Sequence, residues 1–382
     1  MNYIKAISIV ILIILINEFL FIVEVGGKYM GEIITCDENK SGLLLQLHIT
    51  GKCNQHCKHC YHTNYENEPM TFDDIKNIIE QFKELIHKYN KNKGINEKGE
   101  LTITGGEPFV RKDFMDILEL LYENREYFSY QILTNGSFIT DEIADKLLKL
   151  KVNCVQVSID GDEETHDMIR GKGNFVRTFK AIDILNKHNI QTVVSFTASK
   201  LNYKDFPKVA RHCEKHGVKV LWSERLVPIG NGKKIEEQCL SAAECMEYFQ
   251  LMKKEKDLLL SKNSGTEISM KESLQFIVSK ENPQRCSAAD SAISIDEFGN
   301  ILPCRRMPIK CGNVLKDNLS DIYFNNDIMN SIRKRTIPKE CEACRFRKTC
   351  NGGAKCIAYG INKDYSTADP FCPLIFYKRN KN

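Results

Sequence analysis

Three cysteines near the start of the chain are spaced C-x3-C-x2-C, a pattern that can hold a metal cluster: Cys53, Cys57 and Cys60. They directly follow an apolar run, residues 43–50, that is typical of a strand. A loop this short can place three thiolates around one four-iron cluster, which leaves one iron without a protein ligand and therefore open to another molecule. The alternative is a structural zinc site, in which a nearby histidine supplies the fourth ligand: His56, His59 or His62.

Length, charge and cysteine usage limit the class of protein. The chain has 382 residues, 16 cysteines and a formal net charge of +4. This length allows about two or three domains, and the balanced charge gives no indication of a nucleic-acid-binding face. A disulfide scaffold is disfavoured, because the chain is long and has no framework of small loops. We therefore expect metal-binding cysteines in the reducing cytoplasm and no nucleic-acid partner.

The first 29 residues form an apolar extension that differs from the rest of the chain. Residues 7–23 are mainly apolar, but Asn17 and Glu18 interrupt them. The uninterrupted part is too short to span a bilayer, and no cleavage site for a signal peptide follows it. The extension is either a weak membrane anchor through residues 7–23 or a miscalled start, with translation beginning at Met30. We favour the second.

Strand-like and helix-like segments alternate after the cysteine loop. We expect strands at residues 43–50, 101–104, 130–134, 155–159, 192–197 and 218–222. We expect helices at residues 71–89, 113–124, 141–150, 175–188, 206–216 and 241–260. This alternation predicts an α/β fold with a parallel barrel or partial barrel.

The predicted organisation has three parts after the extension. Residues 40–235 form the barrel, residues 236–283 a helical connector, and residues 284–378 a cysteine-rich domain. Half of the 16 cysteines fall in this last part, where long periodic runs are few. We expect its core to be organised by metal rather than by apolar burial.

Four polar turns follow predicted strands: the cysteine loop, Gly105-Gly106-Glu107-Pro108, Asn135-Gly136 and Asp160-Gly161. In α/β barrels, the chemistry takes place at the carboxyl ends of the strands. We therefore expect all four turns to lie on one rim.

The motifs together resemble the radical S-adenosylmethionine (radical SAM) superfamily, in which a strand and a C-x3-C-x2-C loop are followed by a strand ending in GGEP. The C-terminal cysteines resemble those of its SPASM subgroup, named after several peptide and protein maturases: Cys286, Cys304, Cys341, Cys344, Cys350 and Cys372. The resemblance covers residues 43–375. It implies a partial (β/α)6 TIM-like barrel of the radical SAM type with a C-terminal iron–sulfur (SPASM-like) domain.

The resemblance also implies cofactors and chemistry. A 4Fe-4S cluster in the first loop would bind S-adenosylmethionine through its open iron. Reductive cleavage would then give a 5′-deoxyadenosyl radical that abstracts hydrogen from a substrate. One or two auxiliary 4Fe-4S clusters and a reductant such as flavodoxin or ferredoxin would complete the system.

By the same resemblance, a group of residues would contact S-adenosylmethionine. These are Gly105, Gly106, Glu107 and Pro108 at the amino group, Thr134, Asn135 and Ser158 at the methionine or ribose, Arg170 at the carboxylate, and His59 near the adenine. The alternative for each is a turn residue or a surface ion pair. No residue stands out as a catalytic acid, base or radical donor.

The auxiliary ligands that the resemblance implies are incomplete at one position. Cys341, Cys344, Cys350 and Cys372 would hold the distal cluster. The proximal cluster would use Cys286, Cys304 and a cysteine at position 354, which is Ala354 in this chain. Three alternatives stay open: Cys356 replaces the missing ligand through a shifted loop, Cys311 does so, or the proximal cluster is absent.

The expected substrate is a peptide or protein that undergoes modification, and the alternative is haem, tetrapyrrole or other cofactor biosynthesis. Sulfatase-maturing relatives have an aspartate after the cysteine equivalent to Cys304, where this chain has Arg305 and Arg306. Together with Lys310, these arginines would receive an acidic peptide or a carboxylated tetrapyrrole, or else form a solvated basic loop.

Two further observations bear on the substrate and the class of protein. There is no room for a leader-binding domain between Met30 and the barrel, which weakens the interpretation as a leader-dependent peptide maturase. A non-catalytic electron carrier is disfavoured, because it needs neither GGEP nor an open-site loop.

Overall fold

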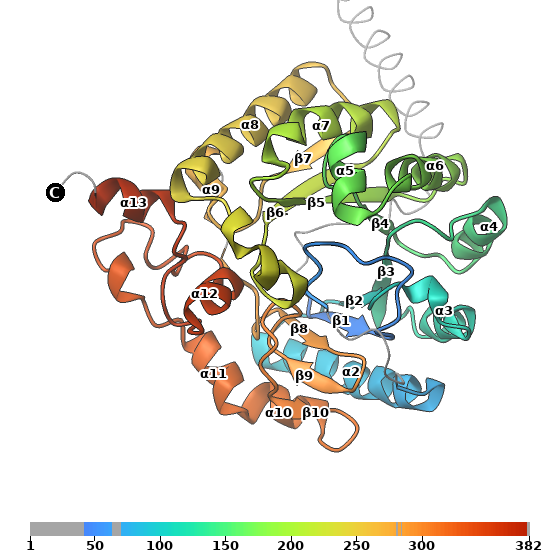
Figure 1. Cartoon of the computed structure of the whole chain (residues 1–382). Coiled ribbons are helices and arrows are strands. Elements are labelled where there is room, and N and C mark those ends of the chain that lie inside the picture. The colour runs from blue at the N-terminus through green and yellow to red at the C-terminus, as the bar shows by residue number, and fades with distance from the viewer. Residues whose placement is uncertain (1–41, 63–69, 280–281, 284, 380–382) are drawn as a thin grey trace, which may run out of the picture. The chain divides into compact units, whose positions relative to one another are not determined.

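A ten-stranded sheet organises the part of the chain that the computed structural model describes, residues 42–62, 70–279, 282–283 and 285–379. The strand order is β10-β9-β8-β1-β2-β3-β4-β5-β6-β7 (Figure 1). The strands are β1 Leu44–His48, β2 Gly99–Thr104, β3 Phe128–Thr134, β4 Val155–Ser158, β5 Thr192–Ala198, β6 Val220–Arg225, β7 Glu267–Ser269, β8 Ala292–Ile295, β9 Asn300–Leu302 and β10 Gly312–Asn313. The expected extension at residues 1–29, its apolar part and Met30 lie outside the described residues.

All strands from β8 through β1 to β7 run parallel, and only β9 and β10 are antiparallel to their neighbours. Six of the parallel strands, β1 to β6, are those expected from the sequence. The fold is thus the predicted α/β fold with an open, partial barrel. β7 and β8 add one parallel strand to each side of this set.

Helices α2 to α8 lie along the outside of the curved sheet, whereas α10 to α13 follow the last strand and belong to the C-terminal part (Figure 1). The helices are α2 Phe72–Lys93, α3 Phe114–Glu123, α4 Asp141–Lys149, α5 Glu163–Arg170, α6 Asn174–Lys187, α7 Phe206–Lys215, α8 Ala242–Ser261, α9 Phe276–Ser279, α10 Leu319–Asn325, α11 Asp327–Lys334, α12 Lys355–Asn362 and α13 Pro373–Arg379. None of the helices in the described residues is long and apolar enough to cross a membrane.

The core lies between the strands and these outer helices. In β1, Leu45 and Leu47 are fully buried, whereas the alternating residues Leu44 and Gln46 are partly exposed. Alternate side chains of a strand point to opposite faces, so one face of β1 packs against the helices and the other faces the barrel interior. Gln46 accordingly lies near Ser294 of β8, with 3.4 Å between the side-chain oxygens.

Some elements differ from the sequence prediction. α2 begins after Thr71, whose side chain forms a capping box with Asp74, and it continues to Lys93, beyond the expected end at residue 89. The stretch expected to be a helical connector also contains strand β7. α5 was not predicted from the sequence, because six of its eight residues are polar or charged and only His166 and Ile169 are buried.

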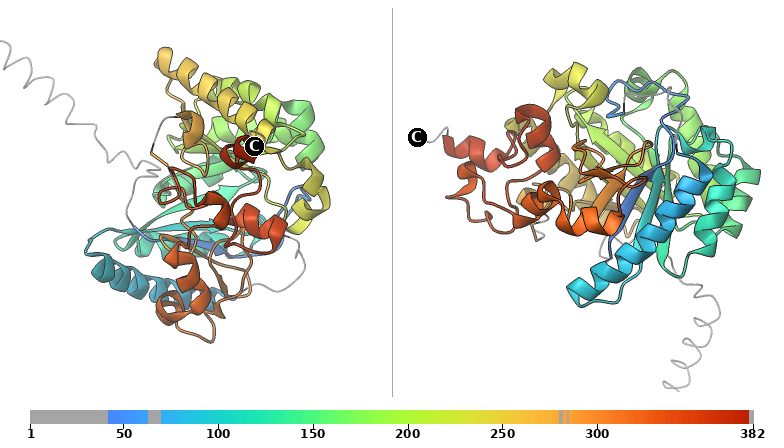
Figure 2. Two further views of the ribbon diagram at one scale, coloured as in Figure 1. Left: turned by 90° about the vertical axis from the view of Figure 1, so that its left-hand side faces the viewer. Right: turned by 90° about the horizontal axis from the view of Figure 1, so that it is seen from below.

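The C-terminal part shares the apolar core of the barrel, which we did not expect. Ile293 and Ile295 of β8 are buried against the barrel, because β8 pairs directly with β1. α10 lies beside α2 (Figure 2), where Gln81 bonds to the backbone of Val314 and Leu319. The hydrophobic core therefore continues from the barrel into the residues after 284, instead of depending on metal alone.

Candidate active site and metal-ligating cysteines

The cysteine loop packs against two glycines, Gly105 and Gly106, that follow β2. The Gly106 N–H donates to the Thr50 carbonyl at 2.7 Å, and the Glu107 N–H donates to the Lys52 carbonyl at 2.8 Å. A Cβ atom on Gly106 would lie 2.2 Å from the Lys52 carbonyl oxygen, and one on Gly105 would lie 2.3 Å from that of Thr50. Only residues without a side chain let the loop approach this closely.

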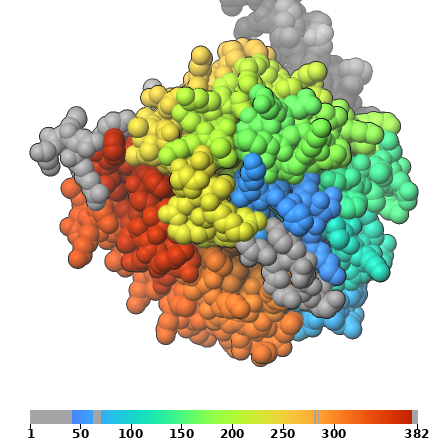
Figure 3. Space-filling view, viewed as in Figure 1, coloured from blue at the N-terminus to red at the C-terminus, as the bar shows by residue number. Residues whose placement is uncertain are grey.

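The 3-10 segment η3, Gly230–Gln238, covers the other end of the loop. The Asn231 N–H donates to the Cys60 carbonyl at 2.8 Å, and a Cβ atom on Gly230 would lie 2.3 Å from the Tyr61 carbonyl oxygen. Gly230 also has φ of +55°, a conformation that favours glycine. Figure 3 shows the blue cysteine loop beside this yellow segment on one face of the molecule. Backbone contacts on both sides thus fix the loop.

The three loop thiols lie together in a partly buried environment. Burial raises the pKa of the Cys53 thiol to about 11, and the charges of Cys57 and Cys60 add to this rise. The Gln55 N–H lies 3.4 Å from Cys53 Sγ, and Arg170 Nη1 lies 3.7 Å from Cys57 Sγ. Neighbouring thiolates with low solvation need a compensating positive charge, which a bound iron cluster supplies. The donor set therefore fits such a cluster.

Glu107 of the GGEP turn is fully buried and already has three donors. Its carboxylate accepts from Thr134 Oγ1 at 2.8 Å, from the Asn135 N–H at 2.8 Å and from the Phe109 N–H at 3.2 Å. Burial raises the pKa of Glu107 to about 7. Asn135 in turn donates from Nδ2 to Asn54 Oδ1 in the cysteine loop at 2.8 Å. Glu107 therefore joins the ends of β2 and β3, and Asn135 connects them to the loop.

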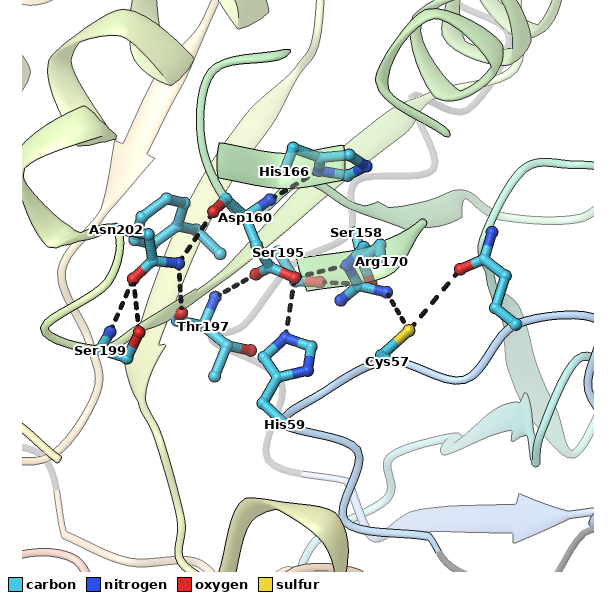
Figure 4. Close-up of polar contacts among 12 residues, drawn as sticks. Cys57, His59, Ser158, Asp160, His166, Arg170, Ser195, Thr197, Ser199 and Asn202 are labelled. Carbon is cyan, nitrogen blue, oxygen red and sulfur yellow. Dashed lines mark hydrogen bonds and ion pairs between the residues drawn. The ribbon is translucent and has the colours of Figure 1, made fainter. Parts of the chain in front are cut away.

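Asp160, just after β4, holds two of the predicted site residues (Figure 4). Its carboxylate lies 2.8 Å from His59 Nε2, pairs with Arg170, and accepts from the Thr197 N–H at 2.8 Å. Burial alone would raise the pKa of Asp160, but Arg170 and His59 outweigh it and hold this pKa well below its usual range. From the sequence we predicted Asp160 only as part of a turn, although its position at the carboxyl end of a strand could have indicated a site residue.

Two serines line the same region from neighbouring strands. Ser158 Oγ of β4 lies 3.2 Å from Ser195 Oγ of β5 (Figure 4). Ser195 was not predicted from the sequence, because a serine in a strand has no distinctive spacing. The residues predicted to contact S-adenosylmethionine thus follow β1, β2, β3 and β4 on one rim.

A second group of thiols consists of Cys286, Cys304 and Cys356. Burial raises the pKa of Cys356 to about 12; nearby Arg306 lowers this pKa, and Cys304 and Cys286 raise it. The three side chains are therefore close enough to influence one another. Cys311 lies elsewhere, beside β9, where its N–H donates to the Ile301 carbonyl.

A third group consists of four cysteines that line one pocket. These are Cys341, Cys344, Cys350 and Cys372. Burial raises the pKa of Cys341 to about 11, and Cys372 and Cys344 contribute to the rise. Apolar side chains, including Leu274 and Phe276, form much of the remaining wall. Such a pocket suits a cluster with four thiolates and little access for other ligands.

A buried ion pair connects the barrel to this third group. Arg225 at the end of β6 donates from Nη1 and Nη2 to the two carboxylate oxygens of Asp369, at 3.2 and 2.5 Å. Asp369 also accepts from the N–H groups of Ala354 and Phe371. It lies three residues before Cys372, so the pair sets the position of a cysteine from inside the barrel.

Two arginines after Cys304 face the interior rather than solvent. The side chains of Arg305 and Arg306 are 9% and 19% exposed, and both lie near Glu224 of β6. Lys310 is exposed. The interpretation as a solvated basic loop is therefore wrong for the two arginines.

Two family models match the chain in sequence. The radical SAM superfamily model matches residues 47–213, and the SPASM model, an iron–sulfur cluster-binding domain, matches residues 286–350. The AdoMet-dependent heme synthase of Methanosarcina barkeri is 27% identical over 86% of this chain and 95% of the relative. The subtilosin biosynthesis protein AlbA of Bacillus subtilis is 27% identical over 90% and 74%, respectively.

Solved structures share the fold. SuiB of Streptococcus suis, bound to S-adenosylmethionine, has a TM-score of 0.68 and 17% identity over 87% of this chain and 77% of that chain. The anSMEcpe structure with AdoMet and the Cp18Cys peptide has a TM-score of 0.67 and 18% identity over 89% and 99%. The chain thus belongs to the radical SAM superfamily, in its SPASM subgroup, and is an enzyme whose cofactors are iron–sulfur clusters and S-adenosylmethionine.

Proposed function

We propose that this enzyme modifies a peptide or protein. A cluster held by Cys53, Cys57 and Cys60 would pass one electron from a reductant to S-adenosylmethionine, and the methionine and 5′-deoxyadenosyl radical formed would allow hydrogen abstraction from the substrate. The observation that carries the proposal is the combination of an open three-cysteine loop with two further thiol groups in one chain. The relatives named bacteriocin subtilosin biosynthesis protein AlbA and mycofactocin maturase MftC, the latter 24% identical over 86% of this chain, support the proposal. SuiB has been solved with its precursor peptide SuiA.

We also propose ligands for three clusters, one for each thiol group. Cys53, Cys57 and Cys60 hold the cluster that binds S-adenosylmethionine. Cys286, Cys304 and Cys356 hold the proximal auxiliary cluster, with Cys356 in place of the cysteine missing at Ala354. Cys341, Cys344, Cys350 and Cys372 hold the distal one.

The remaining residues of the first site bind and orient S-adenosylmethionine. Arg170 receives the carboxylate, because its guanidinium lies beside Cys57 and Asp160 fixes its direction. His59 contacts the adenine through Nδ1, a buried atom with no hydrogen-bond partner among the described residues. Ser158, Thr134 and the GGEP backbone, from Gly105 to Pro108, complete the contacts, and Glu107 and Asn135 hold the turn in place.

Iron analysis tests the ligand proposal. Anaerobically reconstituted enzyme is expected to contain about twelve irons per chain, for three clusters. Cys356→Ala is expected to lose about four of them. Cys311→Ala is the matched control, a buried cysteine of the same region, and is expected to lose none. Full iron in Cys356→Ala, or equal losses in both variants, would contradict the assignment.

A tetrapyrrole is the second candidate substrate, favoured by the interior position of Arg305 and Arg306. Two buried guanidinium groups suit the carboxylates of such a molecule. Relatives named AdoMet-dependent heme synthase and Fe-coproporphyrin III synthase also support it. Glu224 neutralises part of this charge, however, which leaves the peptide as the first candidate.

Parallel assays separate the two substrates. Peptides encoded beside the gene and iron-coproporphyrin III are each incubated with enzyme, S-adenosylmethionine and a reductant. We expect a mass change in a peptide and an unchanged tetrapyrrole. Conversion of the tetrapyrrole with all peptides unmodified would overturn the first candidate.

A cytoplasmic flavodoxin or ferredoxin is the proposed electron donor, and we propose that the enzyme acts in the cytoplasm.

A further inference from the structure

Three side chains outside the thiol groups meet at the carboxyl ends of β1 and β8. His48 is the last residue of β1, Glu297 follows β8 by two residues, and His62 follows the cysteine loop. β1 and β8 are parallel neighbours with Leu47 opposite Ile295, so their ends lie side by side. One ligand atom from each of the three side chains lies within 4.8 Å of the other two. The topology thus brings two imidazoles and one carboxylate to one point.

The buried imidazole of His48 lacks the hydrogen bonds that a buried polar side chain normally makes. It is 4% exposed, yet neither ring nitrogen has a hydrogen-bond partner among the described residues. Burying polar nitrogens without partners costs free energy. A neutral imidazole presents the lone pair that a metal ion binds.

The other two residues already face each other. His62 Nε2 lies 3.5 Å from Glu297 Oε1, and their side chains are 10% and 3% exposed. A cation between the three groups would offset the cost of burying this carboxylate and would give His48 its missing partner.

We propose that His48, His62 and Glu297 bind one divalent transition-metal ion, separate from the iron–sulfur clusters. Two histidines and one carboxylate are the ligand set of several zinc and iron(II) sites, in which the remaining coordination positions stay open. The inference does not depend on whether the substrate is a peptide or a tetrapyrrole.

The location indicates what the ion would do. The ring of Tyr61 packs edge-on against His48, with 5.9 Å between the ring centroids. Tyr61 and His62 directly follow Cys60 in the chain, so the proposed ion lies beside the first thiol group. An open coordination position there would bind a carboxylate or carbonyl oxygen of the substrate and hold it beside the first thiol group.

Zinc binding to the reconstituted holoenzyme tests the proposal. Equilibrium dialysis with Zn²⁺ followed by metal analysis is expected to give one zinc per chain, with iron per chain unchanged. His48→Gln and Glu297→Gln remove one ligand each with little change of volume, and each is expected to weaken zinc binding at least tenfold. His87→Gln is the control, because His87 is an exposed histidine on α2.

X-ray absorption at the zinc edge locates the bound ion. Nitrogen and oxygen ligands at about 2.0–2.2 Å, with no sulfur at about 2.3 Å, are expected for this site. Iron content also reports whether the variants keep the fold around the clusters. Zinc binding that is equal in wild type and both ligand variants, sulfur ligation, or no stoichiometric zinc would each overturn the proposal.

Discussion

Single residues at the end of β2 determine whether the cysteine loop can approach the sheet closely enough to form the site. Gly106 is the clearest case, because its backbone touches the loop and leaves no space for a side chain. The GGEP motif predicted a ligand contact, and the structure adds a second requirement, the close approach of two backbones. A sequence motif indicates which residues could contact a ligand, but it does not show which two backbone segments come into contact.

Gly106→Ala is therefore expected to displace the loop. The new Cβ would lie 2.2 Å from the Lys52 carbonyl, so the loop must move. We expect a loss of about four irons per chain and a decrease in the free energy of unfolding of about 1–3 kcal/mol. Gly265→Ala is the matched control, because nothing lies within 4 Å of its Cβ position. Similar iron contents in the two variants would refute this role of Gly106.

The position of Cys356 beside Cys304 could not be predicted from the sequence. The absence of a cysteine at Ala354 left three alternatives, since a shifted ligand has no fixed spacing. The turn before α12 and the hydrogen bond from Ala354 to Asp369 bring Cys356 beside Cys304. Those contacts join segments that are distant in sequence, so no local pattern contains them.

At the scale of elements, helix α5 fixes the position of Asp160 through a hydrogen bond to its backbone. His166 of α5 accepts the Asp160 N–H at Nδ1, at 3.0 Å, and its Nε2 lies 2.7 Å from Asn174 Oδ1. The ring is fully buried and must be neutral to accept this bond. α5 was missed in the sequence because its apolar face is short, whereas the long amphipathic helices α2 and α8 were found.

His166 is expected to make stability depend on pH. Burial and the nearby Arg170 lower the pKa of His166 to about 4, from 6.5. As the pH falls from 6.5 towards 4, the unfolded chain takes up a proton that the folded protein does not. The free energy of unfolding therefore decreases on acidification, by about 1 kcal/mol between pH 7.5 and 5.5.

Thermal unfolding of wild type and His166→Gln over this pH range measures the effect. Glutamine can accept the same N–H and donate to Asn174, but it does not titrate. The variant is therefore expected to show a smaller pH dependence of its melting temperature. Equal pH dependence in the two proteins would show that His166 is not the responsible group.

At the scale of the whole described chain, the barrel and the C-terminal part share one sheet and one core. Alternating periodicity predicted the six parallel strands β1 to β6 and their order along the chain. It did not predict that β8 pairs with β1, because a strand of four residues carries little signal and its partner lies about 250 residues away. The Arg225–Asp369 pair adds a polar connection between the same two parts.

Asp369→Asn is expected to disturb both parts together. It leaves the buried Arg225 guanidinium without its counter-charge, which costs about 3–5 kcal/mol in the free energy of unfolding. We expect a lower melting temperature and partial loss of iron from the third thiol group. Asp257→Asn, at an exposed aspartate of α8, is expected to change the free energy of unfolding by less than about 0.5 kcal/mol. A variant Asp369→Asn as stable as this control would contradict the account.

The central claim is that the cysteine loop holds the cluster that cleaves S-adenosylmethionine. The most direct measurement is the release of 5′-deoxyadenosine by anaerobically reconstituted enzyme with S-adenosylmethionine and a reductant. We expect steady release by wild type and by Cys311→Ala, and none by Cys57→Ala, because Cys57 is one of only three thiolates on that cluster. Normal release by Cys57→Ala, or no release by wild type with all its iron, would contradict the claim.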